Sequence, residues 1–194
     1  MGLVGNLAAQ LARRQGGRLV AIDISEARLA MARACGIAHT IDSARENALD
    51  RVMAITNGAG VSSLIDATGN SRAILDSMPL IGKLGELILL GSPRGECQSD
   101  VTQALRFCHL YNQGCITFKG AHEFRFPKLT APFVKHSFER NARIIWRMLE
   151  AGELEFERLI THIVSPVDAV AIYAGLRERP AEYMGVVFDW TTIR

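Results

Sequence analysis

Residues 2–23 read GLVGNLAAQLARRQGGRLVAID, and this stretch decides the fold class. Two glycines, Gly2 and Gly5, stand before a run of Ala and Leu that is typical of a helix. The glycine pair at 16–17 ends that run, and a short apolar strand follows, closing on Asp23. Gly2-x-x-Gly5 before a helix is the second half of the G-x-G-x-x-G dinucleotide fingerprint. The buried strand that ends in an acid about 20 residues later is the next part of the same pattern.

The chemistry of a bound pyrophosphate explains these residue types. Glycine lets the backbone approach a phosphate closely, and the positive N-terminus of the helix then holds it. Asp23 would accept hydrogen bonds from the adenosine ribose, and its charge would repel a 2′-phosphate, which favours NAD over NADP. Arg28, one helical turn later, either reaches the same ribose or is a solvated surface residue. The simpler alternatives are a flexible chain end at Gly2 and Gly5, and a helix-preceding acid at Asp23.

Strands alternate with helices along the chain, and each strand is apolar throughout, which predicts a doubly wound α/β sheet of parallel strands. The carboxyl ends of such strands share one edge, where ligands bind. We expect strands at 18–22, 38–41, 63–67, 86–90, 116–120, 160–164 and 185–190. We expect helices at 6–14, 26–34, 45–56, 72–80, 133–149 and 167–177. Gly82 and Gly85 are expected to bracket a turn.

Composition excludes several classes of protein. Lys and Arg number 22 against 20 Asp and Glu, and the two signs are interleaved, so no nucleic-acid footprint appears. The four cysteines form no C-x-x-C pair, which suits a reduced compartment. No leader peptide is visible, and the longest apolar runs are far too short to cross a bilayer. We therefore expect a cytoplasmic protein with no nucleic-acid and no membrane partner.

The sequence resembles the zinc-type medium-chain dehydrogenase/reductase family, which includes alcohol and polyol dehydrogenases. The order and spacing of several stretches carry the resemblance over nearly the whole chain, although no single motif decides it. They are GLVGNLAAQLARRQGG, VAIDISEARLAMARACGIAHTID, GAGVSSLIDATGN, GKLGELILLGSPRG, ITFKGA, GELEFERLITHIVSP and GVVFDW.

The resemblance implies an NAD site built from three groups of residues. The pyrophosphate and ribose group is Gly2, Val4, Gly5, Asp23 and Arg28. The group flanking the adenine side of the cleft is Ala67, Thr68 and Gly69. The group near the nicotinamide is Leu90, Gly91, Ser92, Gly120 and Ala121.

The sequence also departs from the family pattern, because several of the family's segments are not found in it. The family's first strand and first motif glycine should precede Gly2, as should its catalytic and structural zinc ligands. We therefore expect the gene to continue upstream, with the absent strand central in the order 3-2-1-4-5-6. We expect no catalytic and no metal-binding residue in this chain, and zinc only in a full-length form. Residues 1–121 would form an incomplete dinucleotide-binding domain, and residues 122–194 would belong to the substrate domain.

Several readings remain open. The chain could be the NAD-binding part of an alcohol or polyol dehydrogenase, inactive alone, or a non-catalytic nucleotide-binding or assembly module of the same fold. A methyltransferase-like domain also places an acid after its second strand, but the family-like C-terminal half counts against it. A short-chain dehydrogenase is disfavoured because no Tyr-x-x-x-Lys occurs. Asp66 is interpreted as a turn-capping carboxylate, and Trp146 as packing. We also expect a homodimer that pairs through the strand at 116–120.

Overall fold

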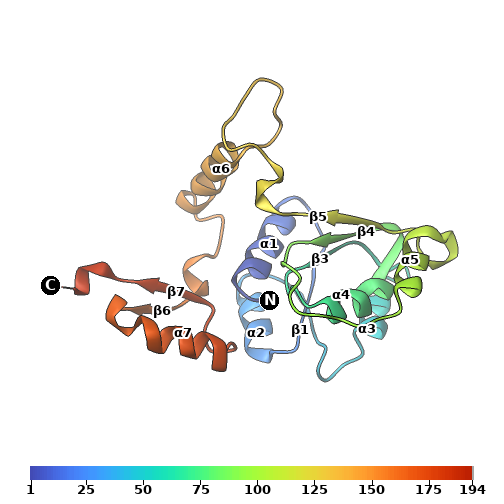
Figure 1. Cartoon of the computed structure of the whole chain (residues 1–194), viewed down its shortest axis with the longest axis horizontal. Helices are drawn as coiled ribbons and strands as arrows, with labels where there is room; N and C mark the ends of the chain where they lie inside the picture. Colours follow the sequence, from blue (N-terminus) through green and yellow to red (C-terminus); the bar gives the residue numbers. More distant parts are fainter. Residues whose placement is uncertain (194) are drawn as a thin grey trace. The chain divides into compact units, whose positions relative to one another are not determined.

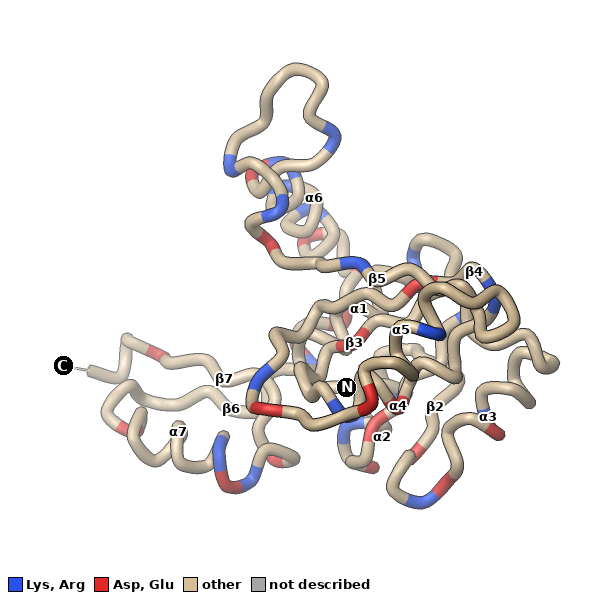
Figure 2. Tube along the Cα trace, turned by 45° about the vertical axis from the view of Figure 1, so that its right-hand side comes forward, with Lys and Arg blue, Asp and Glu red and all other residues tan. Residues whose placement is uncertain are grey.

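The computed structural model describes residues 1–193, which form two compact units: residues 1–45 with 148–193, and residues 46–147. The first unit holds β1 (Val20–Asp23), β2 (His39–Asp42), β6 (Ile160–Val164), β7 (Gly185–Phe188), α1 (Leu3–Arg14), α2 (Glu26–Ala34) and α7 (Ala169–Glu178). The second holds β3 (Val61–Asp66), β4 (Ile81–Leu89), β5 (Thr117–Gly120), α3 (Ala48–Ile55), α4 (Ser71–Ser77) and α5 (Val101–His109). Helix α6 (Phe138–Glu150) crosses the boundary between the units. Figure 1 labels these elements except β2, which Figure 2 labels.

In the first unit, β1 and β2 form a parallel pair that α2 connects, and their last residues, Asp23 and Asp42, are register partners. Strands β6 and β7 form a second parallel pair, connected by α7. Apolar residues around β1 pack with α1 and α2. They are Ala21, Ala32 and Ile37, with Met1, Ala9 and Leu19 against them.

A buried polar contact ties the two chain segments of this unit together. The Gln10 side chain, on α1, accepts a hydrogen bond from the Glu155 backbone N–H at 2.7 Å. It also donates to Asn6 Oδ1 at 2.9 Å, and both amide side chains are almost fully buried. Because burying an amide without a partner is costly, this contact fixes how the C-terminal segment lies on α1.

The second unit is built on a three-stranded parallel sheet in the order β3-β4-β5. Leu87, on the central strand β4, is fully buried beneath α4 and α5. The core around it comprises Ile74, Met78, Ile81 and Ile116.

These parallel ladders and their crossover helices confirm the predicted α/β class. In a doubly wound sheet of order 3-2-1-4-5-6, removing strand 1 leaves the neighbours 3-2 on one side and 4-5-6 on the other. The sheets β1-β2 and β3-β4-β5 have these neighbours. Within residues 1–193, no ladder joins β1 to β3. The two units divide after residues 45 and 147, and not at the boundary expected between residues 121 and 122. The assignment of residues 122–194 to a substrate domain remains a prediction.

Gly82 and Gly85 do not bracket a turn between two strands as expected, because β4 runs through both glycines, although Leu84 between them has a positive φ of 61° and the strand is irregular there. Its pairing with β3 shifts register between Val61 and Ser63. A Cβ on Gly82 would collide with the backbone oxygen of Ala59, so glycine is needed here for a close approach within the sheet.

Two helices also differ from expectation. Helix α5 was not predicted, although Asp100 caps it in the usual way by accepting from the Thr102 N–H at 2.9 Å. Helix α6 begins at Phe138 and not at Phe133, because Phe133 has a positive φ of 65° that is not helical.

Candidate functional site

The N-terminus of α1 is open in the way that an anion site requires. Gly2 is its N-cap, with φ −68° and ψ −170°, and no side chain caps the helix. The first turn carries no acid, and a Cβ on Gly2 would meet nothing within 4 Å. The first backbone N–H groups, including those of Val4 and Gly5, have no acceptor inside the helix, so they are available to a phosphate.

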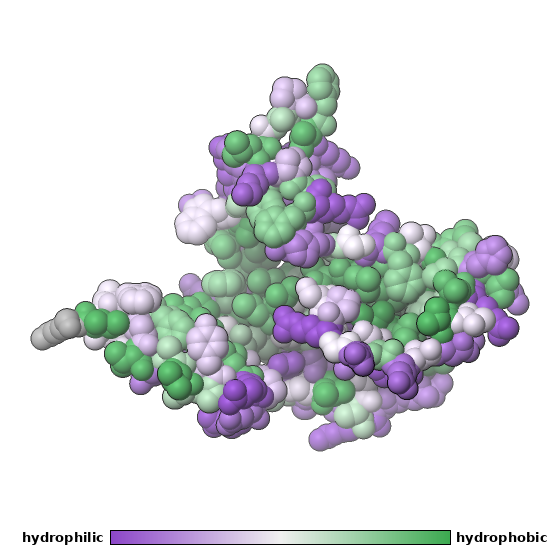
Figure 3. All heavy atoms as spheres, viewed as in Figure 1, coloured by the Kyte–Doolittle hydropathy of each residue, from purple (hydrophilic) through white to green (hydrophobic). Residues whose placement is uncertain are grey.

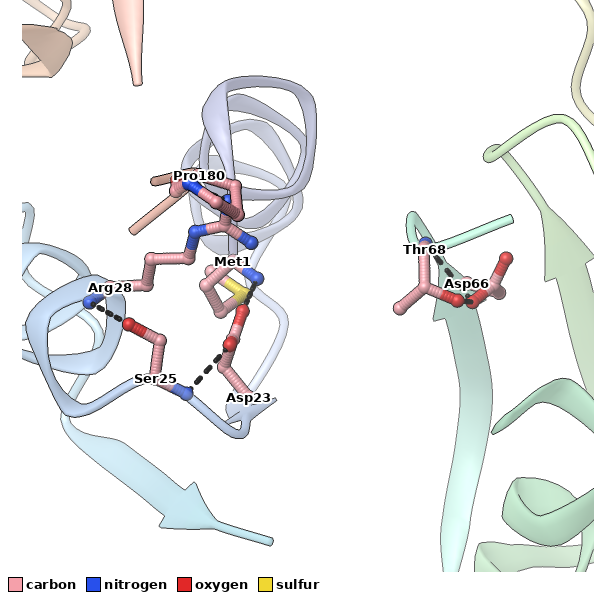
Figure 4. A network of polar contacts seen from close by, with 7 residues as sticks. All are labelled: Met1, Asp23, Ser25, Arg28, Asp66, Thr68 and Pro180. Atoms are coloured by element: carbon pink, nitrogen blue, oxygen red, sulfur yellow. Dashed lines mark hydrogen bonds and ion pairs between the residues drawn. The ribbon is translucent and has the colours of Figure 1, made fainter. Parts of the chain in front are cut away.

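Asp23 lies at the carboxyl end of β1, and its side chain is 8% exposed. Its Oδ1 accepts from the Ser25 N–H at 2.9 Å, while its Oδ2 pairs with the ammonium group of Met1 (Figure 4). Asp23, the carboxylate predicted to bind the ribose, therefore lies beside Met1, which precedes α1 in the same unit. A ligand hydroxyl at Oδ2 would have to replace the ammonium group.

Arg28 is held in α2, but its guanidinium turns to the C-terminal segment. Its backbone N–H donates to Ser25 Oγ at 3.4 Å, so Ser25 is the N-cap of α2. Its Nη2 donates to the carbonyl of Pro180 at 2.7 Å (Figure 4). Arg28 would thus have to exchange this carbonyl for a ribose oxygen.

Asp42 is a second carboxylate at this edge that the sequence argument did not single out. It is the register partner of Asp23 and is only 9% exposed. Its Oδ1 accepts from the Ala44 N–H at 3.0 Å, and its Oδ2 lies 3.4 Å from Arg45 Nε. Its place at the end of a predicted strand was the sequence signal that could have indicated it. The contacts of the Asp42 carboxylate are those of a residue that caps a turn.

In the second unit, Asp66 organises the loop that follows β3. Its Oδ1 accepts from Thr68 N at 3.1 Å and from Thr68 Oγ1 at 2.6 Å (Figure 4). Its Oδ2 accepts from Gly69 N at 3.1 Å, and its side chain is buried. These bonds confirm that Asp66 is a turn-capping residue, and they fix the backbone from Ala67 to Gly69.

The loop after β4 passes this turn at backbone contact. A Cβ on Gly91 would lie 2.5 Å from the N of Gly69 and 3.0 Å from the N of Thr68. A Cβ on Gly69, where φ is +64°, would collide with the backbone oxygen of Ser92. Only glycine fits this approach, so the predicted residues 67–69 and 90–92 lie side by side.

The end of β5 completes the same edge. Gly120 pairs with Leu89 in the ladder, and Ala121 N donates to Leu89 O at 3.0 Å. A Cβ on Gly120 would meet nothing within 4 Å, so its surface is open. The second unit thus gathers eight of the predicted site residues at the carboxyl ends of three parallel strands, and the first unit holds the other five.

Residues 1–193 do not fit a zinc site. No group of three or more His, Cys, Asp or Glu side chains in this range could hold a metal ion. Cys35 is buried, and its burial raises the pKa of the thiol, which disfavours the thiolate that a metal requires. No helix in the same range is long and apolar enough to cross a membrane.

Known proteins match both the sequence and the fold. The family profile described as "Zinc-binding dehydrogenase" matches residues 4–131, about two thirds of the chain. The chain belongs to the zinc-binding dehydrogenase family. An L-threonine 3-dehydrogenase of Caldanaerobacter subterraneus subsp. tengcongensis is 27% identical over 147 residues, which cover 71% of this chain and 42% of that protein.

An uncharacterized zinc-type alcohol dehydrogenase-like protein of Haemophilus influenzae is 30% identical over 185 residues, 95% of this chain and 48% of that protein. Among solved structures, a putative NADPH:quinone reductase from Bacillus thuringiensis superposes with a TM-score of 0.76 at 18% identity, covering 97% of this chain and 54% of that one. The chain therefore spans about half the length of these proteins, and its fold is similar to that of the solved structure.

Proposed function

We propose that this chain is the NAD-binding part of a zinc-type alcohol or polyol dehydrogenase and that it does not turn over substrate by itself. The observation that carries the proposal is the partly buried Asp23 carboxylate at the end of β1, in the same unit as the open N-terminus of α1. A carboxylate and a helix N-terminus are the two groups that a ribose and a pyrophosphate need.

Each part of the dinucleotide has proposed partners. The pyrophosphate lies on the N–H groups of Val4 and Gly5, beside Gly2, and the adenosine ribose on Asp23 and Arg28. The loop of Ala67, Thr68 and Gly69 flanks the adenine side. The nicotinamide lies near Leu90, Gly91, Ser92, Gly120 and Ala121. The cofactor itself supplies hydride chemistry when bound, and these backbone groups orient it.

NAD should bind more tightly than NADP because a 2′-phosphate would meet the negative charge of Asp23. The Asp23→Asn variant keeps an oxygen that can accept from Ser25 N but removes the charge. We expect titration calorimetry to show that this variant loses most of the preference for NAD over NADP.

The matched control is Asp42→Asn, which removes a carboxylate of similar burial from the neighbouring strand end. It should leave the ratio of the two affinities unchanged. Tighter binding of NADP than of NAD by the unmodified chain would overturn the role of Asp23. Alcohol oxidation by the purified chain would overturn the proposal that it is inactive alone.

We further propose a cytoplasmic homodimer, with residues 122–194 belonging to the substrate domain. All four residues of β5 are exposed, and within residues 1–193 this strand pairs only with β4. A symmetry mate pairing along β5 would satisfy its open row of backbone groups.

A further inference from the structure

Residues 179–183, here called the C-terminal turn, lie between α7 and β7 in the first unit. The turn contacts α2, because the carbonyl oxygen of Pro180 accepts a hydrogen bond from Nη2 of Arg28 at 2.7 Å. Arg28 is one of the residues proposed to hold the adenosine ribose. A backbone group 152 residues further along the chain therefore holds a side chain of the proposed dinucleotide site.

Contacts within the C-terminal turn hold it in one conformation. Glu182 N donates to the carbonyl of Arg179 at 3.0 Å, and the Glu182 carboxylate pairs with the Arg179 guanidinium, also at 3.0 Å. The same guanidinium donates to Tyr183 Oη at 3.2 Å and lies over the tyrosine ring, 5.7 Å from its centroid. Hydrophilic side chains gather at this end of α7 (Figure 3). Arg179 is thus the residue that closes the turn.

Tyr183 anchors the C-terminal turn to the two elements beside it. Its ring stacks on that of His162, in β6, with the centroids 4.2 Å apart and the planes 7° from parallel. It also lies against α7, because a Cβ on Gly175 would collide with the tyrosine ring. The carbonyl of Pro180 is therefore presented to Arg28 by a turn that is fixed from two sides.

Arg28 is able to act on the choice between NAD and NADP in either direction. An arginine near the adenosine ribose is a usual partner of a 2′-phosphate, which it grips with two parallel N–H groups. Asp23 repels the same phosphate. Within residues 1–193, Asp23 pairs with the Met1 ammonium group and no ion pair joins it to Arg28, so neither charge neutralises the other. The effect of Arg28 therefore depends on where its guanidinium is held.

The bond to Pro180 decides that position. A ribose hydroxyl needs only one of the N–H groups that this bond leaves free on the Arg28 guanidinium. A bidentate grip on a phosphate instead requires the planar guanidinium to turn its fork toward the phosphate. Turning the fork would break the bond to the Pro180 carbonyl, so this bond disfavours NADP and leaves NAD unaffected.

We propose that the C-terminal turn is a specificity-determining element for the cofactor. By holding Arg28 on the Pro180 carbonyl, it withholds the guanidinium from a 2′-phosphate and adds to the preference for NAD that Asp23 sets. The inference rests on the proposed dinucleotide site and deepens it. It places a determinant of cofactor choice in the C-terminal segment, among residues that the sequence analysis did not assign to the site.

The test compares the affinities of the whole chain for NAD and NADP by titration calorimetry. Arg179→Met removes the ion pair and the ring contact that close the turn. Arg28, released from a fixed carbonyl, should then reach the 2′-phosphate. The ratio of NADP affinity to NAD affinity should rise about tenfold, which corresponds to one hydrogen bond to a charged group. Pro180→Gly, which keeps the carbonyl and frees the backbone, should raise the ratio in the same direction.

Two further variants separate this mechanism from a simple loss of charge. Arg177→Met removes an equal charge from an exposed arginine that pairs with Glu178 outside the turn. Losing a cation weakens binding of the more negative NADP, so this control should lower the ratio or leave it unchanged. Arg28→Met combined with Arg179→Met should show no gain, because the effect acts through Arg28.

Circular dichroism and thermal unfolding establish that each variant is folded before it is titrated. If Arg179→Met does not fold, Pro180→Gly carries the test, because it removes no side-chain contact of the turn. A constant ratio in the folded turn variants while NAD still binds would overturn the inference and leave the proposed function intact. So would an equal rise in Arg177→Met, or a gain that persists without Arg28. If the unmodified chain binds neither dinucleotide, the proposed function fails and the inference fails with it.

Discussion

The Asp66→Asn substitution tests whether a buried carboxylate holds the loop that is proposed to flank the adenine side of the dinucleotide. Asp66 accepts three hydrogen bonds, from Thr68 N, Thr68 Oγ1 and Gly69 N. Asparagine keeps one oxygen, which can still serve Thr68. Its NH₂ group, however, would face the N–H of Gly69, so that bond is lost and a buried donor has no partner.

The structure sets the size of the effect. A hydrogen bond to a charged group is worth about 1.5–3 kcal/mol, and an unsatisfied buried donor costs about 1–3 kcal/mol. These two terms describe the same lost bond and do not add fully, so we expect a loss of about 2–3 kcal/mol. Asp66→Ala removes all three bonds and should cost more, about 4 kcal/mol.

Urea unfolding followed by circular dichroism measures this loss, with a lower midpoint and an unchanged slope. Hydrogen exchange of the Gly69 amide should accelerate by roughly 30- to 150-fold if exchange follows the same opening. Asp76→Asn is the control, because the Asp76 side chain is 64% exposed and lies 4.0 Å from Arg72. If Asp66→Asn unfolds within about 0.5 kcal/mol of the unmodified chain, the assignment of Asp66 as the residue that fixes this turn is refuted.

Three further outcomes are expected. Elemental analysis of the purified chain should find far less than one zinc per chain, because residues 1–193 contain no adequate ligand group, and a stoichiometric zinc would contradict this. Light scattering should give the mass of a dimer that Phe118→Glu on β5 dissociates, whereas a monomer in the unmodified chain would remove the β5 interface. Lys119, and then Ser63, hydrogen-bond to Glu86 and hold its pKa below the ordinary 4.5. This stabilisation is present above about pH 4.5 and is lost as the pH falls through the lowered pKa, so acid should destabilise the unmodified chain more than Lys119→Met, and equal acid sensitivity would contradict the contact.

Features encoded by neighbouring residues could be predicted from the sequence. The bounds of α2 agree with expectation at both ends, because Ser25 caps its start and Gly36 follows its end. The turn at Asp66 was interpreted correctly for the same reason, since a short acid bonds to the backbone two and three residues ahead.

Features that depend on distant residues could not be predicted. Gly82 and Gly85 resemble turn residues, yet both lie inside β4, where a side chain on Gly82 would collide with the backbone of Ala59. The guanidinium of Arg28 bonds to a carbonyl 152 residues away, which no local pattern encodes. The close contact of residues 67–69 with residues 90–92 arises from the pairing of β3 with β4, so composition alone indicates flexible loops there.

The division of the chain has a consequence for the order in which it folds. The second unit is continuous, so it can form as soon as residues 46–147 have left the ribosome. The first unit combines the two ends of the chain, and closing its contacts means bringing together segments separated by roughly a hundred residues. The Gln10 to Glu155 bond cannot form until residue 155 has been synthesised, after the whole of the second unit. The segment that carries Asp23 must therefore wait while the entire second unit is made before the strands that complete its own unit exist.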